Sequence, residues 1–224
     1  MKRLTIAIDG PAGAGKSTVA KRLAKELGYT YMDTGAMYRA FAWKVRQGGI
    51  DLEDEEKLRE ALRRTNVELS DREGNLKVLL DGRDVTTEIR TPELSQWASK
   101  ISALGPVRER MVELQRAMGA RGGVVAEGRD IGTVVFPQAD VKVFLTAGPE
   151  ERAKRRFAEL KEQGKRVSLD ETLEEMVERD RRDQERALAP LRRAEDAVAI
   201  DSTGRTVDQV MEQIMQEIKK KMST

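Results

Sequence analysis

A short segment near the start of the chain carries glycines, a lysine and a hydroxyl residue at a spacing suited to binding phosphate. Residues 10–17 read Gly-Pro-Ala-Gly-Ala-Gly-Lys-Ser and fit the phosphate-loop pattern G-x-x-x-x-G-K-S/T. In this pattern, backbone amides at the start of a helix hold phosphate oxygens, and glycines let the backbone approach them closely. The pattern predicts that Lys16 bridges the β- and γ-phosphates of a nucleoside triphosphate and that the Ser17 hydroxyl faces Mg²⁺.

Two further groups of charged residues follow predicted strands. Asp33 to Arg39 follow one strand, and Glu127 to Asp130 follow another. Doubly wound sheets bind ligands at the carboxyl ends of their strands. An arginine beside a phosphate loop has an obvious anionic partner, so Arg39 and Arg129 are candidates for gripping a second anion.

The highly charged stretch after residue 149 holds two sets of residues that each share a helix face: Arg152, Arg155 and Arg156, and then Arg179, Asp183 and Arg186. The first set is a candidate for closing over the triphosphate. The second is spaced i, i+4, i+7, which on its own is more typical of a surface salt-bridge ladder than of a site.

Composition narrows the chemistry. The chain of 224 residues has no cysteine and no histidine, which excludes disulfides, thiolate chemistry and histidine acid–base catalysis. Its 41 basic and 39 acidic residues nearly cancel, and only 4% of residues are aromatic, which together argue against a nucleic-acid partner. Dense mixed charge is also typical of heat-tolerant proteins, and heat tolerance is a separate hypothesis.

The sequence has no apolar stretch long enough to span a membrane, so we expect a cytoplasmic protein with no membrane contact. We also expect a monomer.

The missing histidine also bears on the acceptor. An alcohol acceptor would benefit from a base, a role open to Asp33 or Asp130, whereas a phosphate monoester is largely dianionic at neutral pH and needs none. Arginines without histidine therefore favour a phosphate acceptor. A GTP-hydrolysing switch is disfavoured, because the chain lacks an N-K-x-D sequence and its D-x-x-G at 71–74 falls in a predicted turn.

The elements that position these residues follow from hydrophobic patterning. A helix is predicted over Lys16–Leu27, ended by Gly28. Short apolar runs predict five buried strands at Leu4–Ile8, Tyr29–Met32, Gly123–Ala126, Val141–Leu145 and Ala197–Ile200. Long helical stretches separate the runs, so the sequence predicts an α/β fold: a doubly wound five-stranded parallel sheet with helices on both faces.

The middle of the chain departs from this rhythm. Residues 67–85 alternate in strand fashion with turn signals at 71–75 and 81–82, which predicts a small antiparallel unit. Thr91-Pro92 begins one helix, and Gly105-Pro106 separates it from a second that runs toward Met118. We expect a core of residues 1–60 and 105–224, a helical lid around 150–190 and an acceptor-binding insert at 61–104.

Two later helices carry sequence signatures of their first turns. Ser168 and Glu171 form a possible capping box for a helix that reaches about Ala187. Thr206 with Gln209 opens the last helix in the same way.

Six segments together resemble the bacterial cytidylate kinase family, a group of phosphate-loop nucleoside monophosphate kinases. They are IDGPAGAGKST, MDTGAMYRA, EIRTPELSQWASKISALGPVRERM, VAEGRDIGTVVFPQADVKVFL, ERDRRDQERALAPL and IDST, in this order across essentially the whole chain. The resemblance implies transfer of the ATP γ-phosphoryl group to CMP or dCMP, giving CDP or dCDP and ADP, with Mg²⁺ bound alongside ATP.

The resemblance also implies roles for individual residues. ATP binding falls to Gly10, Pro11, Ala12, Gly13, Ala14, Gly15, Lys16, Ser17 and Thr18, and catalysis to Lys16, Arg129 and Arg186. CMP binding falls to Thr34, Arg39, Ser99, Arg108, Arg129, Asp130, Arg179, Asp183 and Arg186, which favours a site over a salt-bridge ladder on the charged helix. Ser17 stands where relatives also have glycine, so Mg²⁺ is held either by the hydroxyl or only by phosphates and water. Two rival readings are a kinase for an alcohol or another nucleotide, and a non-catalytic nucleotide-binding regulator.

Overall fold

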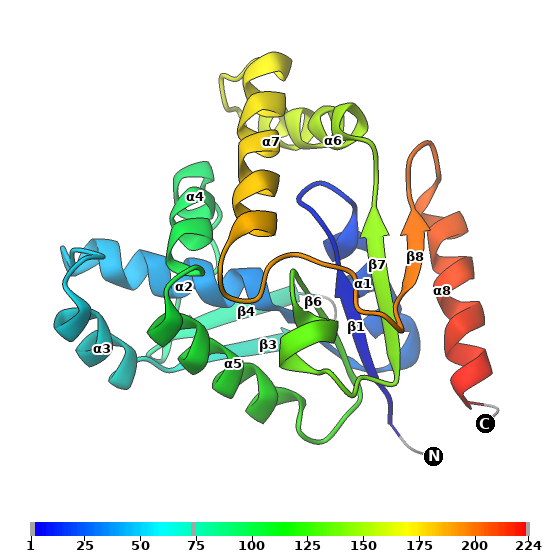
Figure 1. Cartoon of the computed structure of the whole chain (residues 1–224), viewed down its shortest axis with the longest axis horizontal. Helices are drawn as coiled ribbons and strands as arrows, with labels where there is room; N and C mark the ends of the chain where they lie inside the picture. The colour runs from blue at the N-terminus through cyan, green and yellow to red at the C-terminus, as the bar shows by residue number, and fades with distance from the viewer. Residues whose placement is uncertain (1–2, 73–74, 223–224) are drawn as a thin grey trace.

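The computed structural model describes residues 3–72 and 75–222, which build a five-stranded parallel sheet surrounded by helices (Figure 1). The strands lie in the order β2-β6-β1-β7-β8, and each neighbouring pair is parallel. Their bounds are β1 (Thr5–Asp9), β2 (Thr30–Asp33), β6 (Val124–Gly128), β7 (Val141–Thr146) and β8 (Val198–Asp201). The predicted five-stranded parallel sheet is confirmed.

Each of these strands extends one or two residues further toward its carboxyl end than the apolar runs predict. Asp9 remains in the ladder because it pairs with Gly128, and Asp33 remains because it pairs with Glu127. In each strand, the run of apolar residues ends before the hydrogen-bonded ladder with the neighbouring strand does. The sheet therefore presents polar side chains at the edge where parallel α/β proteins bind ligands.

Helices cover both faces of the sheet. Ile6 and Ile8 of β1 belong to the large hydrophobic core, whereas Ala7 between them belongs to a smaller core together with Ile131 and Val135. Successive strand residues point to opposite faces, so both faces of β1 are buried. The elements packed around the sheet include α1 (Lys16–Leu27), α5 (Gly105–Gly119), a π-helix η1 (Ile131–Val135) and α8 (Val207–Met222).

Helix ends follow local sequence chemistry. The α1 helix begins and ends as predicted, and Gly28 after it adopts a left-handed conformation with φ of 63°. Thr91 caps α4 (Pro92–Ile101) through a hydrogen bond from Leu94 N. The predicted capping box of Ser168 and Glu171 opens α7 (Leu169–Glu185). The α7 helix stops two residues before the predicted end, because the backbone of Arg186 turns extended.

The antiparallel unit inserted between α2 (Thr34–Gln47) and α4 is also confirmed. The strands β3 (Val67–Arg72), β4 (Asn75–Leu80) and β5 (Arg83–Asp84) form one sheet in that order. The predicted turn at 71–75 contains residues 73–74, which lie outside the described residues, whereas Asp81 and Gly82 form the second predicted turn with φ of 52° and 82°. A helix that the sequence analysis did not single out, α3 (Glu55–Arg63), precedes this sheet.

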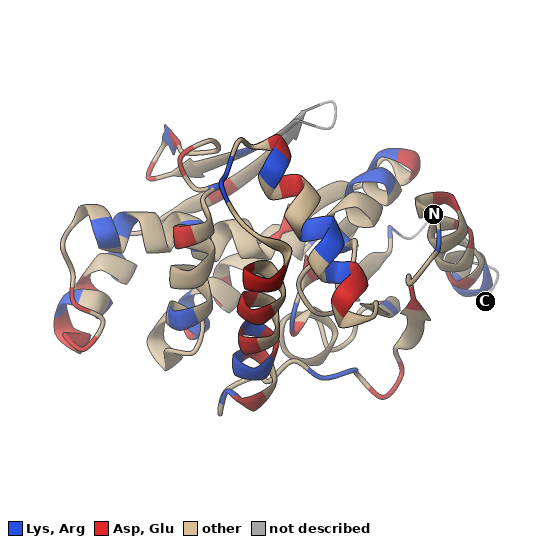
Figure 2. Cartoon of the chain, turned by 90° about the horizontal axis from the view of Figure 1, so that it is seen from above, with Lys and Arg blue, Asp and Glu red and all other residues tan. Residues whose placement is uncertain are grey.

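Two charged helices stand over the carboxyl edge of the main sheet (Figure 1). They are α6 (Pro149–Glu162) and α7, which pack against each other, and α7 also contacts α4. Figure 2 looks down on this pair and shows basic and acidic residues along both helices. Between residues 3–72 and 75–222, no helix combines the length and apolar content needed to cross a bilayer.

Candidate active site

A cavity of about 1060 Å³ opens at the carboxyl ends of β1, β2 and β6, beneath α6 and α7. It gathers residues that are far apart in the chain. Of the residues named from the sequence, it is lined by Ala12, Gly13, Gly15, Lys16, Ser17, Thr18, Thr34, Arg39, Ser99, Arg108, Arg129, Asp130, Arg155, Arg156, Arg179, Asp183 and Arg186. One cavity of this size can hold two ligands side by side.

The phosphate loop connects β1 to α1 and requires glycine at two positions. Gly10 has φ of 150°, and a Cβ there would overlap the Leu145 carbonyl oxygen of neighbouring β7. Gly13 has φ of 72°, and a Cβ there would lie 2.8 Å from Met176 Cε and 2.9 Å from Arg152 O. The loop is therefore closely packed between the sheet and the helices above it. Gly10, Pro11 and Ala14 shape the loop without lining the cavity.

Lys16 is the first residue of α1 and is only 5% exposed. Its Nζ donates a hydrogen bond of 2.6 Å to the Pro11 carbonyl oxygen across the loop. Burial, together with the charge of Arg129, lowers the pKa of the Lys16 amine to about 7. An anion placed between these two cations would relieve their repulsion, so the loop favours phosphate binding.

Carboxylates line the cavity beside Lys16 and Ser17. Glu127 is the penultimate residue of β6 and accepts a hydrogen bond from the Tyr31 hydroxyl. Burial, reinforced by the charge of Asp33, raises the pKa of the Glu127 carboxyl. Burial also disfavours the Asp33 carboxylate, but the Arg39 guanidinium and neighbouring groups outweigh it and hold the pKa of Asp33 below its usual value. Asp33 is thus a fixed negative charge at the floor of the cavity.

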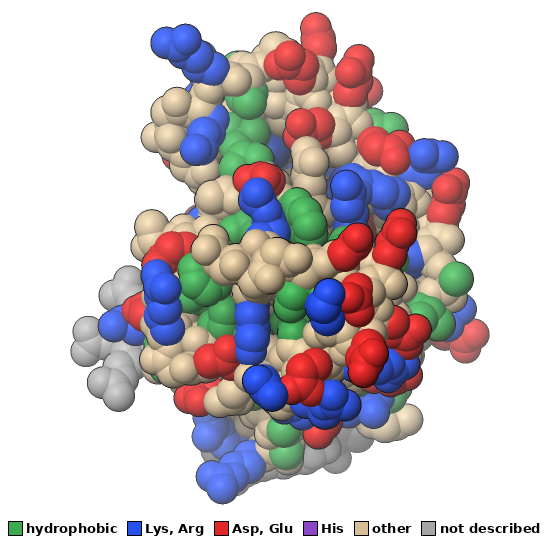
Figure 3. Space-filling view, turned by 90° about the vertical axis from the view of Figure 1, so that its left-hand side faces the viewer, with side chains coloured by type: hydrophobic (Ala, Val, Ile, Leu, Met, Phe, Trp, Pro, Cys, Tyr) green, Lys and Arg blue, Asp and Glu red, His purple; other side chains and the backbone are tan. Residues whose placement is uncertain are grey.

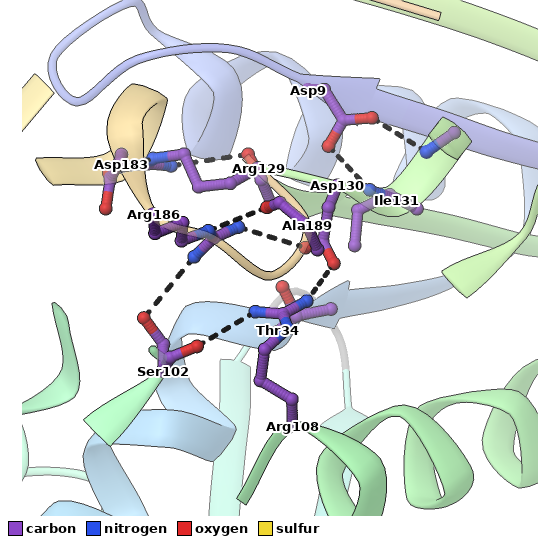
Figure 4. Close-up of polar contacts among 12 residues, drawn as sticks. Asp9, Thr34, Ser102, Arg108, Arg129, Asp130, Ile131, Asp183, Arg186 and Ala189 are labelled. Atoms are coloured by element: carbon purple, nitrogen blue, oxygen red, sulfur yellow. Dashed lines mark hydrogen bonds and ion pairs between the residues drawn. The ribbon is translucent and has the colours of Figure 1, made fainter. Parts of the chain in front are cut away.

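A buried polar network occupies the side of the cavity away from the loop (Figure 4). Asp130 pairs with Arg108, whose Nη1 also donates to the Ser102 carbonyl oxygen at 3.1 Å. Arg186 approaches the other Asp130 oxygen at 3.8 Å, donates to Ala189 O at 2.6 Å and reaches Ser102 Oγ at 3.4 Å. These contacts fix the Asp130 carboxylate between two guanidinium groups.

A second ion pair links the loop after β6 to α7. Arg129 Nε lies 2.9 Å from Asp183 Oδ2, while Ser99 Oγ lies 3.5 Å from Asp183 Oδ1. Arg179 Nε is 3.9 Å from the same carboxylate. Burial opposes the Asp183 charge, yet Arg129 and Arg179 keep the pKa of its carboxyl below the usual value. Asp183 is 3% exposed, so the charged set on α7 forms part of the cavity and not a surface ladder.

Arginine donors remain available on this side. Within the described part of the chain, Arg179 Nε and Arg186 Nη2 are buried and make no hydrogen bond. Partial burial and the nearby Arg129 charge lower the pKa of Arg179 to about 10. Buried guanidinium nitrogens that make ion pairs but no hydrogen bond, on cations held against one another, indicate that the cavity is built to receive an anionic ligand.

The three arginines of α6 take different positions. Arg155 and Arg156 line the cavity, and Arg155 also donates to Ser202 O at 2.8 Å. Arg152 does not line it: its Nη1 lies 2.6 Å from Asp180 Oδ2 and 3.1 Å from Ala12 O. Arg152 therefore fastens α6 and α7 to the phosphate loop.

Some cavity residues were not named from the sequence. Arg90 lines the cavity just before the cap of α4, and its charge helps to lower the pKa of Asp33. Ser102 shares the network of Arg108 and Arg186. The run Glu-Ile-Arg-Thr before a capped helix was a signal for Arg90, whereas nothing in the sequence distinguishes Ser102 from other serines.

Comparisons with known proteins agree on one family. Residues 6–220 match the sequence model of the family described as cytidylate kinase. A cytidylate kinase of Caldicellulosiruptor saccharolyticus is 51% identical over 96% of both chains, and one of Pelotomaculum thermopropionicum is 55% identical over 95% of both. A solved structure of an uncharacterized protein from Eubacterium ventriosum, 15% identical, covers 97% of this chain and 99% of its own with a TM-score of 0.53, and supports the fold alone.

Proposed function

The chain belongs to the cytidylate kinase family and transfers the γ-phosphoryl group of ATP to CMP or dCMP, and we propose that the cavity described above carries out this transfer. We call the loop 10–18 the donor side. The acceptor side consists of Thr34, Arg39, Ser99, Arg108, Arg129, Asp130, Arg179, Asp183 and Arg186. The single observation that carries the proposal is that both sides face one cavity, with Arg129 close enough to Lys16 to help lower the pKa of its amine.

On the donor side, the loop amides and the N-terminus of α1 hold the triphosphate, and Lys16 stabilises charge on the transferred group. Its pKa of about 7 in the empty protein rises when phosphate oxygens surround it, so the ammonium form predominates during transfer. Arg155 and Arg156 reach the cavity from α6 and add positive charge when the two helices close as a lid.

On the acceptor side, Arg39 and Arg129 hold the phosphate of CMP in line with the donor. Because a phosphate monoester is already ionised at neutral pH, the protein's task is to position and neutralise two anions, and no side chain needs to remove a proton. The buried donor of Arg186 adds to this binding. Ser99, Arg179 and Asp183 contact the pentose.

Selection of the base falls to the network around Asp130. Its carboxylate, held by Arg108 and Arg186, accepts a hydrogen bond from the exocyclic amine of cytosine. Uracil has a carbonyl oxygen at that position and would leave a buried acceptor facing another acceptor. Thr34, whose hydroxyl donates to Glu127 O at 2.7 Å, borders the same region.

The donor set fits Mg²⁺ bound with ATP. The Ser17 hydroxyl and the carboxylates of Asp33 and Glu127 line the cavity near the donor phosphates, and oxygen ligands of this kind suit Mg²⁺. The described residues contain no group of three or more carboxylates gathered as a metal cage, so phosphate oxygens and water would complete the shell. When bound, Mg²⁺ neutralises charge on the β- and γ-phosphates.

The proposal is tested by supplying the purified protein with Mg²⁺, ATP and a panel of acceptors. We expect CDP from CMP and dCDP from dCMP, slower reaction with UMP and no product from AMP or shikimate, measured as ADP release together with product identity. Absence of CDP overturns the proposed function. ATP binding without transfer to any acceptor would indicate the regulator reading, and transfer to shikimate would indicate an alcohol kinase.

A further inference from the structure

Asp9 is a buried carboxylate that the transfer described above does not use. It ends β1, directly before the phosphate loop, and is 5% exposed. Its Oδ1 accepts a hydrogen bond of 2.8 Å from Ile131 N, and its Oδ2 accepts one of 2.7 Å from Gly132 N (Figure 4). Both donors belong to the first residues of η1, which follows the acceptor-side residues Arg129 and Asp130.

The beginning of η1 needs hydrogen-bond acceptors from outside the helix. The first amides of a helix have no partner within it, and an aspartate at the preceding position commonly accepts from them. Asp130 holds that position, but its side chain makes no capping hydrogen bond. Its carboxylate is instead directed to Arg108 and Arg186. Asp9, from a different strand, accepts from two of these amides.

The environment of Asp9 is unfavourable for a charge. Burial, opposed by the two amides and reinforced by the charge of Asp130, raises the pKa of the Asp9 carboxyl to about 6. Lys16 is the nearby cation that offsets this in part. The buried charge is therefore retained at a cost, while its two oxygens satisfy two buried main-chain N–H groups that an apolar residue would leave unpaired.

We propose that Asp9 is a positioning residue for the acceptor side: it caps η1 in place of Asp130 and so keeps the Asp130 carboxylate turned toward Arg108, Arg186 and the cytosine amine. This inference rests on the proposed function. Asp9 also connects the two sides of the cavity, because it directly precedes the donor loop and holds the segment that carries Arg129 and Asp130.

The first test is Asp9→Asn, which keeps the size of the side chain but turns one acceptor into a donor that faces a main-chain N–H. We expect Asp130 to be drawn toward the uncapped amides. The ratio of kcat/KM for CMP to that for UMP should then fall at least tenfold, and the KM for CMP should rise, while the KM for ATP changes less than twofold.

The matched control is a carboxylate that contacts the other end of β1. Asp140 Oδ2 accepts a hydrogen bond of 2.8 Å from Thr5 N, so Asp140→Asn disturbs a comparable carboxylate-to-backbone contact of β1 far from the cavity. We expect this variant to lower the thermal midpoint and to keep the CMP-to-UMP ratio of the wild type.

A second variant, Asp9→Ser, covers the case in which Asp9→Asn does not fold. The shorter hydroxyl side chain has a single oxygen and cannot accept from both Ile131 N and Gly132 N as the carboxylate does. We expect a severalfold fall in the CMP-to-UMP ratio. If the folded variants keep that ratio and lose only thermal stability, the proposal is overturned. A wild-type protein that forms no CDP would instead overturn the proposed function.

Discussion

On the donor side of the cavity, nine consecutive residues from 10 to 18 form one loop and the first turn of α1, whereas the acceptor side takes its residues from α2, α4, α5, α7 and the segment after β6. The donor side depends on backbone conformation, as the φ values of Gly10 and Gly13 show. The acceptor side depends on guanidinium groups held by carboxylates. A site for the triphosphate, which is shared by many ligands, can be built from one segment of the chain. Recognition of a particular base and sugar needs side chains from distant segments that the whole fold brings together.

The contrast extends to the molecular surface. On the face shown in Figure 3, basic and acidic side chains are interspersed and apolar side chains form small separate groups. In the cavity, by contrast, basic residues outnumber acidic ones. The positive charge is therefore concentrated where two phosphate-bearing ligands meet.

The largest effect is expected from Lys16→Met on the donor side. The variant keeps the aliphatic stem but removes the charge, so kcat should fall by about a thousandfold, within the range for loss of a charge-stabilising donor. Because the Lys16 amine is buried at a cost in the empty protein, the thermal midpoint should not fall. Turnover close to wild type would remove Lys16 from the transfer step.

The next effect tests whether the donor side is purely local. Asp180→Ala leaves the Arg152 guanidinium, which contacts Ala12 O, without its buried partner. We expect a loss of about 3 kcal/mol in unfolding free energy and a higher KM for ATP. Glu178→Ala, which breaks ion pairs with Arg181 and Arg182 at the surface of the same helix, is the control and should cost less than about 1 kcal/mol. Equal midpoints for the two variants would contradict the role given to Arg152.

On the acceptor side, Asp130→Ala should reduce discrimination between CMP and UMP by roughly ten- to a hundredfold, because the acceptor that rejects uracil is gone. The ratio between CMP and dCMP is an internal control: we assign the pentose to residues other than Asp130, so that ratio should stay constant. An unchanged preference for CMP over UMP would exclude Asp130 from base recognition.

The smallest expected effect is the uptake of a proton when ATP binds. With a pKa of about 7, Lys16 is largely neutral in the empty protein at pH 8, and triphosphate binding raises that pKa. ATP binding at pH 8 should therefore take up a proton, and binding at pH 6 should not. Calorimetry in two buffers of different ionisation enthalpy measures this uptake, which should be absent in Lys16→Met. Identical uptake in the variant would assign the proton to another group.

The same contrast explains how much the sequence could predict. The strand, loop and helix at the start of the chain, the five strands of the sheet and the capping box at Ser168 follow from contiguous patterns, and the structure confirms them. Arg39 and Arg129 were proposed from their place after predicted strands, and the other acceptor residues from the family resemblance, because spacing along one helix cannot show that Asp183 meets Arg129 from the segment after β6. Arg152 illustrates the same limit: helical periodicity groups it with Arg155, but only tertiary packing reveals that it points to the loop backbone.

The small antiparallel sheet has a consequence for how substrate preference can change. Of the described residues of β3, β4 and β5, none lines the large cavity, yet β3 and β4 pack against α2, which carries Thr34 and Arg39. Variation in these strands would then shift α2 and change the spacing of the acceptor side, while the side chains assigned to the nucleotide stay the same. The sheet of β3, β4 and β5 is therefore a unit whose sequence can change during evolution while the residues that carry out phosphoryl transfer stay the same.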